Sequence, residues 1–191
     1  MQLGLDREFV DEAARAADRL AAPSAARPDE APAGVPHRDL ARRVQTLPAA
    51  HRSPHSVLHG SEPAVAAAMT HLTALRALQT PSGLFAGGDN VQSPPDSAFT
   101  VNDVCDAHVL AVDAGPELGE VATALAEIAG AASERLRTGG VHTPNHRWEL
   151  CAALARLHRS FPDDRLLERV DAWLAEGVGL DAEGLYSERR A

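Results

Sequence analysis

Three side chains suited to proton transfer or carboxylate recognition stand close together between positions 145 and 149. Asn145, His146 and Glu149 follow Pro144, a residue that fits the first position of a helix. His146 and Glu149 are three residues apart and would share one helix face. A helix N-terminus carries unpaired N–H groups and a positive partial charge, so it favours a carboxylate ligand. An amide, an imidazole and a carboxyl group gathered there can orient a substrate, polarise it and move a proton.

The same stretch has two other interpretations. In the first, Asn145 caps the helix, while Arg147 and Glu149 are surface groups. In the second, His142 and His146 join Glu149 in a metal site of two histidines and one carboxylate. A proline between the two histidines keeps them off one continuous helix face. We therefore expect no metal ligand here.

Tyr186, the only tyrosine, stands in a turn-like segment two residues after a glycine. A phenol beside a cation or a hydrogen-bond donor can serve as a base or an acid, although a tyrosine that only anchors the tail is an equal alternative. His51, His55 and His59 recur every four residues, but a proline and serines interrupt the row. That pattern predicts solvated loop histidines rather than metal ligands.

Two further pairs of reactive residues are more typical of structure than of catalysis. Asp103 and Asp106 are three apart on an expected helix, which favours a polar stripe. Cys105 and Cys151 stand in apolar stretches and form no CxxC pattern, so we expect buried free thiols. Free thiols fit a reducing compartment.

The elements that must position these residues are helices. Apolar residues recur with a period near 3.6 almost throughout, and strand signals are nearly absent. The expected helices cover residues 6–22, 37–47, 62–79, 99–113, 117–138, 145–160 and 164–176. Residues 80–98 cannot continue a helix, and a loop of this length in a compact domain is usually functional or disordered.

We divide the chain into an N-terminal helix (1–22), a flexible linker rich in Pro and Ala (23–36) and a helical domain (37–191). The later helices read as antiparallel pairs with polar loops gathered at one end. Such pairs suggest an all-α fold made of helical hairpins that form part of an (α/α) toroid or a solenoid-like stack. A plain helical bundle is the simpler alternative.

Composition excludes several functional classes. The 191 residues include 27 acids and 18 cations, all arginine, for a net charge of −9. This balance argues against nucleic-acid and anionic-membrane partners, and the lack of lysine excludes Schiff-base chemistry. No signal peptide and no apolar run long enough to span a membrane is visible, so we expect a soluble, cytoplasmic protein.

Two stretches, GGVHTPNHRWELCAALARL and, some forty residues on, DAEGLYSERR, resemble the toroid part of heparinase II/III-like proteins, a group of polysaccharide lyases. The segment LFAGGDNVQSPPDSAFTVNDVC is similar to the loop and helix that precede them in those proteins. The resemblance covers about residues 80–191. It implies β-elimination on a uronate-containing glycan or oligosaccharide, without a cofactor.

The resemblance also implies roles for individual residues. His146 would be the base or orienting group, and Tyr186 the base and acid. Asn145 and Glu149 would bind or neutralise the substrate carboxylate. Asn90, Gln92 and Asp96 would line the cleft, and Trp148 or Phe85 would stack on sugar rings.

The sequence departs from the family pattern in two ways. About seven helices are too few for a complete toroid, and no β-sandwich follows, so we expect a truncated domain that a partner chain could complete. The charge of −9 disfavours heavily sulfated glycans. Two alternatives stay open: a non-catalytic glycan-binding or scaffold remnant, and a glycoside hydrolase that pairs Glu149 with Asp96, Asp103 or Asp106.

Overall fold

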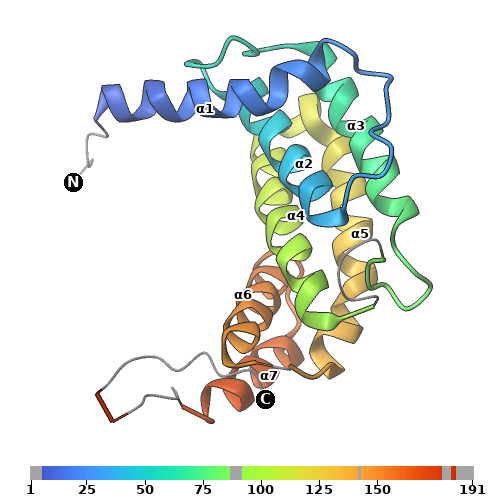
Figure 1. The fold of residues 1–191 in the computed structure, drawn as a ribbon, viewed down its shortest axis with the longest axis vertical. Helices are drawn as coiled ribbons and strands as arrows, with labels where there is room; N and C mark the ends of the chain where they lie inside the picture. Colours follow the sequence, from blue (N-terminus) through green and yellow to red (C-terminus); the bar gives the residue numbers. More distant parts are fainter. Residues whose placement is uncertain (1–5, 87–91, 142, 178–181, 184–191) are drawn as a thin grey trace.

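The fold is all-α, as expected. The computed structural model describes residues 6–86, 92–141, 143–177 and 182–183. Within them the only extended pairing is an isolated antiparallel bridge between Gln79 and Phe85. The helices are α1 (Arg7–Ala25), α2 (His37–Arg52), α3 (Glu62–Ala77), α4 (Pro94–Ala114), a short 3-10 helix η1 (Gly115–Leu118), α5 (Gly119–Thr138), α6 (Pro144–Ser160) and α7 (Asp164–Leu174) (Figure 1).

The helices form two layers of antiparallel hairpins. In one layer α4 packs between α2 and α6, and in the other α5 contacts both α3 and α7. The hairpins α2/α3, α4/α5 and α6/α7 join the layers. The C-terminal part of α1 packs on α2 and α3, and its N-terminal part extends away from the body (Figure 1). The expected hairpins are therefore present, while their closure into a toroid remains a proposal.

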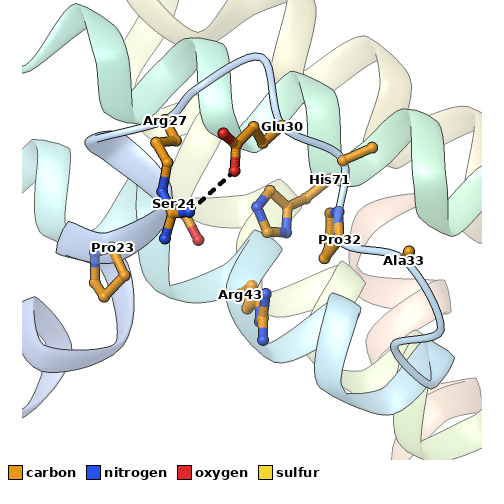
Figure 2. Close-up of a pocket in the computed structure, with 9 residues that line it drawn as sticks. Pro23, Ser24, Arg27, Glu30, Pro32, Ala33, Arg43 and His71 are labelled. Carbon is orange, nitrogen blue, oxygen red and sulfur yellow. Dashed lines mark hydrogen bonds and ion pairs between the residues drawn. The ribbon is translucent and has the colours of Figure 1, made fainter.

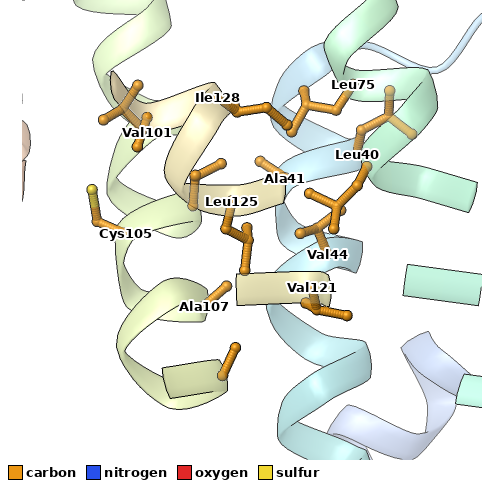
Figure 3. Packing of buried hydrophobic residues seen from close by; sticks show 14 of the residues in the cluster. Leu40, Ala41, Val44, Leu75, Val101, Cys105, Ala107, Val121, Leu125 and Ile128 are labelled. Atoms are coloured by element: carbon orange, nitrogen blue, oxygen red, sulfur yellow. The ribbon is translucent and has the colours of Figure 1, made fainter. Parts of the chain in front are cut away.

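A single hydrophobic core lies between the two layers. It includes Leu40 and Val44 of α2, Val101 of α4, and Leu125 and Ile128 of α5, each 1% exposed or less (Figure 3). Many of the other core residues are alanines, which let the helix backbones approach closely. Dense packing of this kind makes even small changes of side-chain volume costly.

The two cysteines are free and buried, as expected. Burial raises the pKa of the Cys105 thiol to about 12. Burial also raises the pKa of the Cys151 thiol. Since the thiolate is the reactive form, both cysteines are packing residues at neutral pH.

Helix α4 begins five residues before the expected start. Two prolines, Pro94 and Pro95, occupy its first turn, where a missing N–H group costs nothing, and the Ser93 hydroxyl accepts a hydrogen bond from the Asp96 N–H. The predicted loop over 80–98 is therefore wrong in its last five residues. Its apolar members Leu84 and Phe85 are buried, as expected.

Helix α2 also runs past its expected end. It continues through Pro48 to Arg52 and carries His51 into the interior, where the residue is 7% exposed and its Nδ1 lies 3.1 Å from the Ser61 carbonyl oxygen. The prediction of a solvated loop histidine at this position is therefore wrong. His55, on the following loop, is exposed and pairs with Asp11 at 2.7 Å.

The linker between α1 and α2 is shorter than expected. Helix α1 includes Pro23 in its last turn and ends at Ala25, three residues beyond the predicted end. Residues 26–36 then lead to α2 through turns.

The start of the loop after α3 is fixed against α5. The Gln79 amide donates hydrogen bonds to the carbonyl oxygens of Gly83 (2.8 Å) and Ile128 (2.9 Å). Gly83 has a φ of +86°, and a Cβ atom placed there would lie 1.9 Å from the Ala131 carbonyl oxygen. A glycine is therefore required at this position both for its backbone conformation and for the close approach to α5.

We predict that Gly83→Ala destabilises the fold by more than Gly60→Ala. Gly60 has a φ of +67° but open space around its Cβ position, so it carries the conformational strain without the clash. The clash should add about 1–3 kcal/mol to the loss at position 83. Urea unfolding of both variants measures this difference, and equal losses would contradict the close contact with α5.

Two histidines are buried without charge. His37 is fully buried, stacks on Phe85 and lies 2.6 Å from the Thr100 hydroxyl through its Nδ1; His71 is 2% exposed. Burial, with a smaller effect of Arg38, lowers the pKa of His37. The pKa of His71 is lowered in the same way, mainly by burial. The unfolded chain therefore binds protons at these positions at a higher pH than the folded chain does.

We predict that the free energy of unfolding falls as the pH is lowered from about 7 to about 5. A histidine whose pKa is lowered by folding keeps its full stability above its unfolded pKa of 6.5 and loses it as the pH drops below that value. The expected slope is up to about 1.4 kcal/mol per pH unit for each such histidine. His37→Asn should flatten the profile, whereas His59→Asn, at an exposed position, should leave it unchanged. Identical slopes in both variants would refute the assignment.

Candidate functional site

The first turn of α6 holds the residues that the sequence singled out. Helix α6 starts at Pro144, as predicted from the proline, and Thr143 precedes it as N-cap. The Asn145 side-chain oxygen accepts hydrogen bonds from the Thr143 hydroxyl and from the His146 N–H, the latter at 2.9 Å. The alternative in which Asn145 caps the helix is therefore wrong: Asn145 lies inside α6, and its side-chain oxygen is engaged within the first turn, which leaves its NH2 group for a ligand.

Glu149 faces α4 rather than open solvent. Its Oε1 accepts a hydrogen bond of 2.6 Å from the side-chain amide of Asn102, which is itself 7% exposed. The Asn102 oxygen in turn accepts from Arg156 at 3.2 Å, and Arg156 Nε donates to Asp106 at 2.9 Å. We call these four residues, Glu149, Asn102, Arg156 and Asp106, the polar chain between α4 and α6.

Asp103 lies beside the polar chain, and the surrounding charges and burial shift the pKa of its carboxyl group. It is half-buried, and burial is the main reason that its pKa is raised. The negative charges of Asp106 and Glu149 raise this pKa further, while the cations Arg42 and Arg156 lower it. Charged groups from α2, α4 and α6 therefore interact around one carboxyl group. We call Arg42 of α2, Asn102, Asp103 and Asp106 of α4, and Glu149 and Arg156 of α6 the polar face of α2, α4 and α6. This polar face is the candidate site.

The polar face can be reached from solvent. The side chains of Arg156 and Asp106 are 39% and 40% exposed, and Arg42 is exposed. Sequence analysis did not identify Arg42, Asn102 or Arg156, because they lie on three different helices and form no motif along the chain. A usable signal was the run of polar residues at 102, 103 and 106, one face of an otherwise apolar helix.

An ion pair continues the polar face toward the start of α4. Arg38 of α2 pairs with Asp96, whose side chain is 10% exposed, and the Arg38 guanidinium lies 4.0 Å from the centre of the Phe99 ring. Asp96 was expected to line a cleft, but it is held in this pair. Its role in the structure is to fix α2 to α4.

Several connecting segments gather at the end of the layers where α4 and α6 begin and α5 ends (Figure 1). A Cβ atom at Gly139 would lie 2.6 Å from Pro94, and Arg169 of α7 donates a hydrogen bond to the Gly139 carbonyl oxygen at 3.2 Å. A cavity of about 310 Å³ lies there, and Gln92 and Arg135 are among its lining residues. Gln92 therefore lines a surface cavity at the end of α5, and its role as a substrate contact stays a prediction.

Arg147 fixes the segment that follows α7 to the first turn of α6. Its side chain is 8% exposed, pairs with Glu176 at 2.9 Å and donates to the Gly177 carbonyl oxygen at 2.6 Å. The prediction of a surface group at 147 is therefore wrong. Its guanidinium also lies 5.0 Å from the centre of the half-buried Trp148 ring. Tyr186 follows this anchored segment by nine residues and lies outside the described part of the chain.

The expected site residues thus divide into groups. Asn145, His146, Trp148 and Glu149 lie near the start of α6, where Glu149 bonds to Asn102 of α4 and the Asn145 oxygen bonds within its own turn. Asn90 and His142, like Tyr186, lie outside the described residues. Within the described ranges, no three His, Cys, Asp or Glu side chains are grouped so that they could hold a metal ion.

Comparisons with protein-family profiles, with curated proteins and with solved structures find no match to this chain. In the described parts of the chain, none of the helices combines the length and the apolar character needed to cross a bilayer.

We predict that Asn102→Ala lowers the free energy of unfolding by about 1–3 kcal/mol, because Glu149 and Arg156 both lose a hydrogen-bond partner at a largely buried position. Glu149→Gln keeps an acceptor for the amide and should cost less. Chemical denaturation of the two variants gives the comparison. A smaller loss for Asn102→Ala than for Glu149→Gln would mean that the polar chain does not join α4 to α6.

Proposed function

We propose that this chain is a lyase-type domain, similar to heparinase II/III-like proteins, that acts by β-elimination on a uronate-containing glycan or oligosaccharide. The observation that carries the proposal is the polar face of α2, α4 and α6, to which Glu149 contributes three residues after His146 on α6. Glu149 is thereby linked through Asn102 to charged groups that solvent can reach.

The layer arrangement supports this proposal. Hairpins stacked side by side in two layers are the units from which an (α/α) toroid is built. In a toroid made from this chain, we place α2, α4 and α6 in the inner layer, because this layer carries the polar face. The partner chain or further hairpins that would close the ring belong to the same proposal.

The proposed reaction needs no co-reactant. His146 takes the proton from C5 of the uronate, the electron pair forms the C4–C5 double bond, the bond from C4 to the glycosidic oxygen breaks, and Tyr186 protonates that oxygen. The substrate carboxylate must be neutralised for C5 to become acidic. Arg42 and Arg156 suit this task better than Glu149, since an ionised Glu149 repels the substrate.

Arg147 connects α6 to the segment that leads toward Tyr186. The buried guanidinium holds residues 176 and 177 against α6, so the segment toward Tyr186 starts beside the first turn of that helix. This supports a common site for His146 and Tyr186.

We predict that the chain produces an unsaturated uronate, detected by its ultraviolet absorbance, from at least one member of a panel of uronate glycans of low sulfation. His146→Ala and Tyr186→Phe should each lower the rate at least about 100-fold, since each removes a proton-transfer group. His59→Ala, a matched change at an exposed position, should keep the native rate. Absence of product from a folded, helical protein that still binds the glycan would instead identify a non-catalytic binding domain.

A glycoside hydrolase is the second candidate, and the environment of Asp103 favours it. A carboxyl group with a raised pKa beside Glu149 is the combination that acid–base cleavage of a glycoside requires. The two activities differ in product, because hydrolysis releases a reducing sugar without an unsaturated ring. Asp103→Asn should abolish hydrolysis, whereas His146→Ala should leave it intact. The reverse pattern supports the lyase.

A further inference from the structure

A second polar cavity lies between the end of α1, α2 and α3, and none of its lining residues belongs to α6. It has a volume of about 420 Å³, in the range of small-molecule sites, and lies under the segment that joins α1 to α2. Its lining includes Ser24, Arg27 and Glu30 from the end of α1 and the segment after it, Arg43 of α2 and His71 of α3. Figure 2 shows these side chains around one space.

The charges around this cavity do not cancel. Arg27 and Glu30 form an exposed ion pair at 3.2 Å, so their charges offset each other (Figure 2). Arg43 is half-buried and, within the described ranges, has no carboxylate at ion-pair distance. Since a half-buried guanidinium gains from a charged partner, the cavity is suited to a ligand with one negative charge.

His71 provides a second, independent indication of a ligand. The residue is 2% exposed, yet its Nδ1 atom has no hydrogen-bond partner in the described part of the chain. Burial and the neighbouring Arg43 lower its pKa, so the ring is neutral at pH 7 and can donate or accept one hydrogen bond. Buried polar atoms are rarely left unpaired in native proteins. Half-buried Ser24 also lines the cavity and adds a hydroxyl group to it.

We propose that this cavity binds the carboxylate of a small hydroxylated organic acid, with Arg43 on the carboxylate and His71 and Ser24 on hydroxyl groups. One unpaired guanidinium matches the single charge of a carboxylate better than the double charge of a phosphate monoester. This site is independent of the polar face of α2, α4 and α6, and it does not require that the chain be a lyase.

The test is an NMR titration of the full chain with gluconate, with glucose as the neutral analogue and inorganic phosphate as the competing anion. The His71 ring resonances, assigned with a His71→Gln variant, are the readout. Gluconate should shift them to saturation, glucose should not, and Arg43→Gln should weaken gluconate binding at least tenfold. Arg76→Gln removes the same charge from an exposed position on α3 and should change the affinity less than twofold.

Glu30→Gln provides a test by gain of affinity. It frees Arg27 from its ion pair, so gluconate should bind more tightly, by about threefold or more. This outcome cannot arise from partial unfolding. The proposal is overturned if no acid shifts the His71 resonances, if Arg43→Gln behaves like Arg76→Gln, or if phosphate binds more tightly than gluconate. Elimination activity in the His146→Ala and Tyr186→Phe variants is measured separately, so either site can fail alone.

Discussion

The position of α4 constrains the rest of the structure. It packs against α2 and α6 within its own layer and against α5 in the other, so its apolar side must fill the core. Asn102, Asp103 and Asp106 of α4 then lie on the side between α2 and α6, where burial makes each unpaired group costly. Asn102 meets this constraint by bonding to both Glu149 and Arg156. The same arrangement that stabilises the α4–α6 contact thereby concentrates charged side chains on one face.

The helices were predictable because the apolar period is strong and their ends carry local signals. The side chains of Ser61 and Asp163 accept hydrogen bonds from backbone N–H groups at the starts of α3 and α7, as expected of N-cap residues just before a helix. The ends misplaced near Pro48 and Pro94 share one cause. A proline usually ends a helix, but Pro94 lies in a first turn, and Pro48 lies inside α2, where it is buried with the apolar residues of that helix. Tertiary contacts determine where these two helices begin or end, and such contacts cannot be predicted from local helix propensity.

The candidate site was only partly predictable for a related reason. The first turn of α6 is a local feature, so its residues could be found from spacing. The partners that change their chemistry are distant in sequence: Asn102 turns Glu149 away from solvent, and Glu176 takes Arg147 out of the surface. The cavity at Arg43 and His71 combines three separate helical segments and leaves no motif. The polar face and the cavity at Arg43 and His71 are candidate sites for the same reason. Each holds polar side chains at the edge of the hydrophobic core, and packing of the core does not require them.

The most direct test of the central claim is to map where a uronate oligosaccharide contacts the chain. Backbone NMR shifts of the His146→Ala variant, which should bind without turnover, would be followed as the oligosaccharide is added. Perturbations should concentrate on residues 102–106 of α4, on 145–149 of α6 and around Arg42 of α2. If they are absent from these segments, or are confined to the cavity of Arg43 and His71, the polar face of α2, α4 and α6 is not a substrate site.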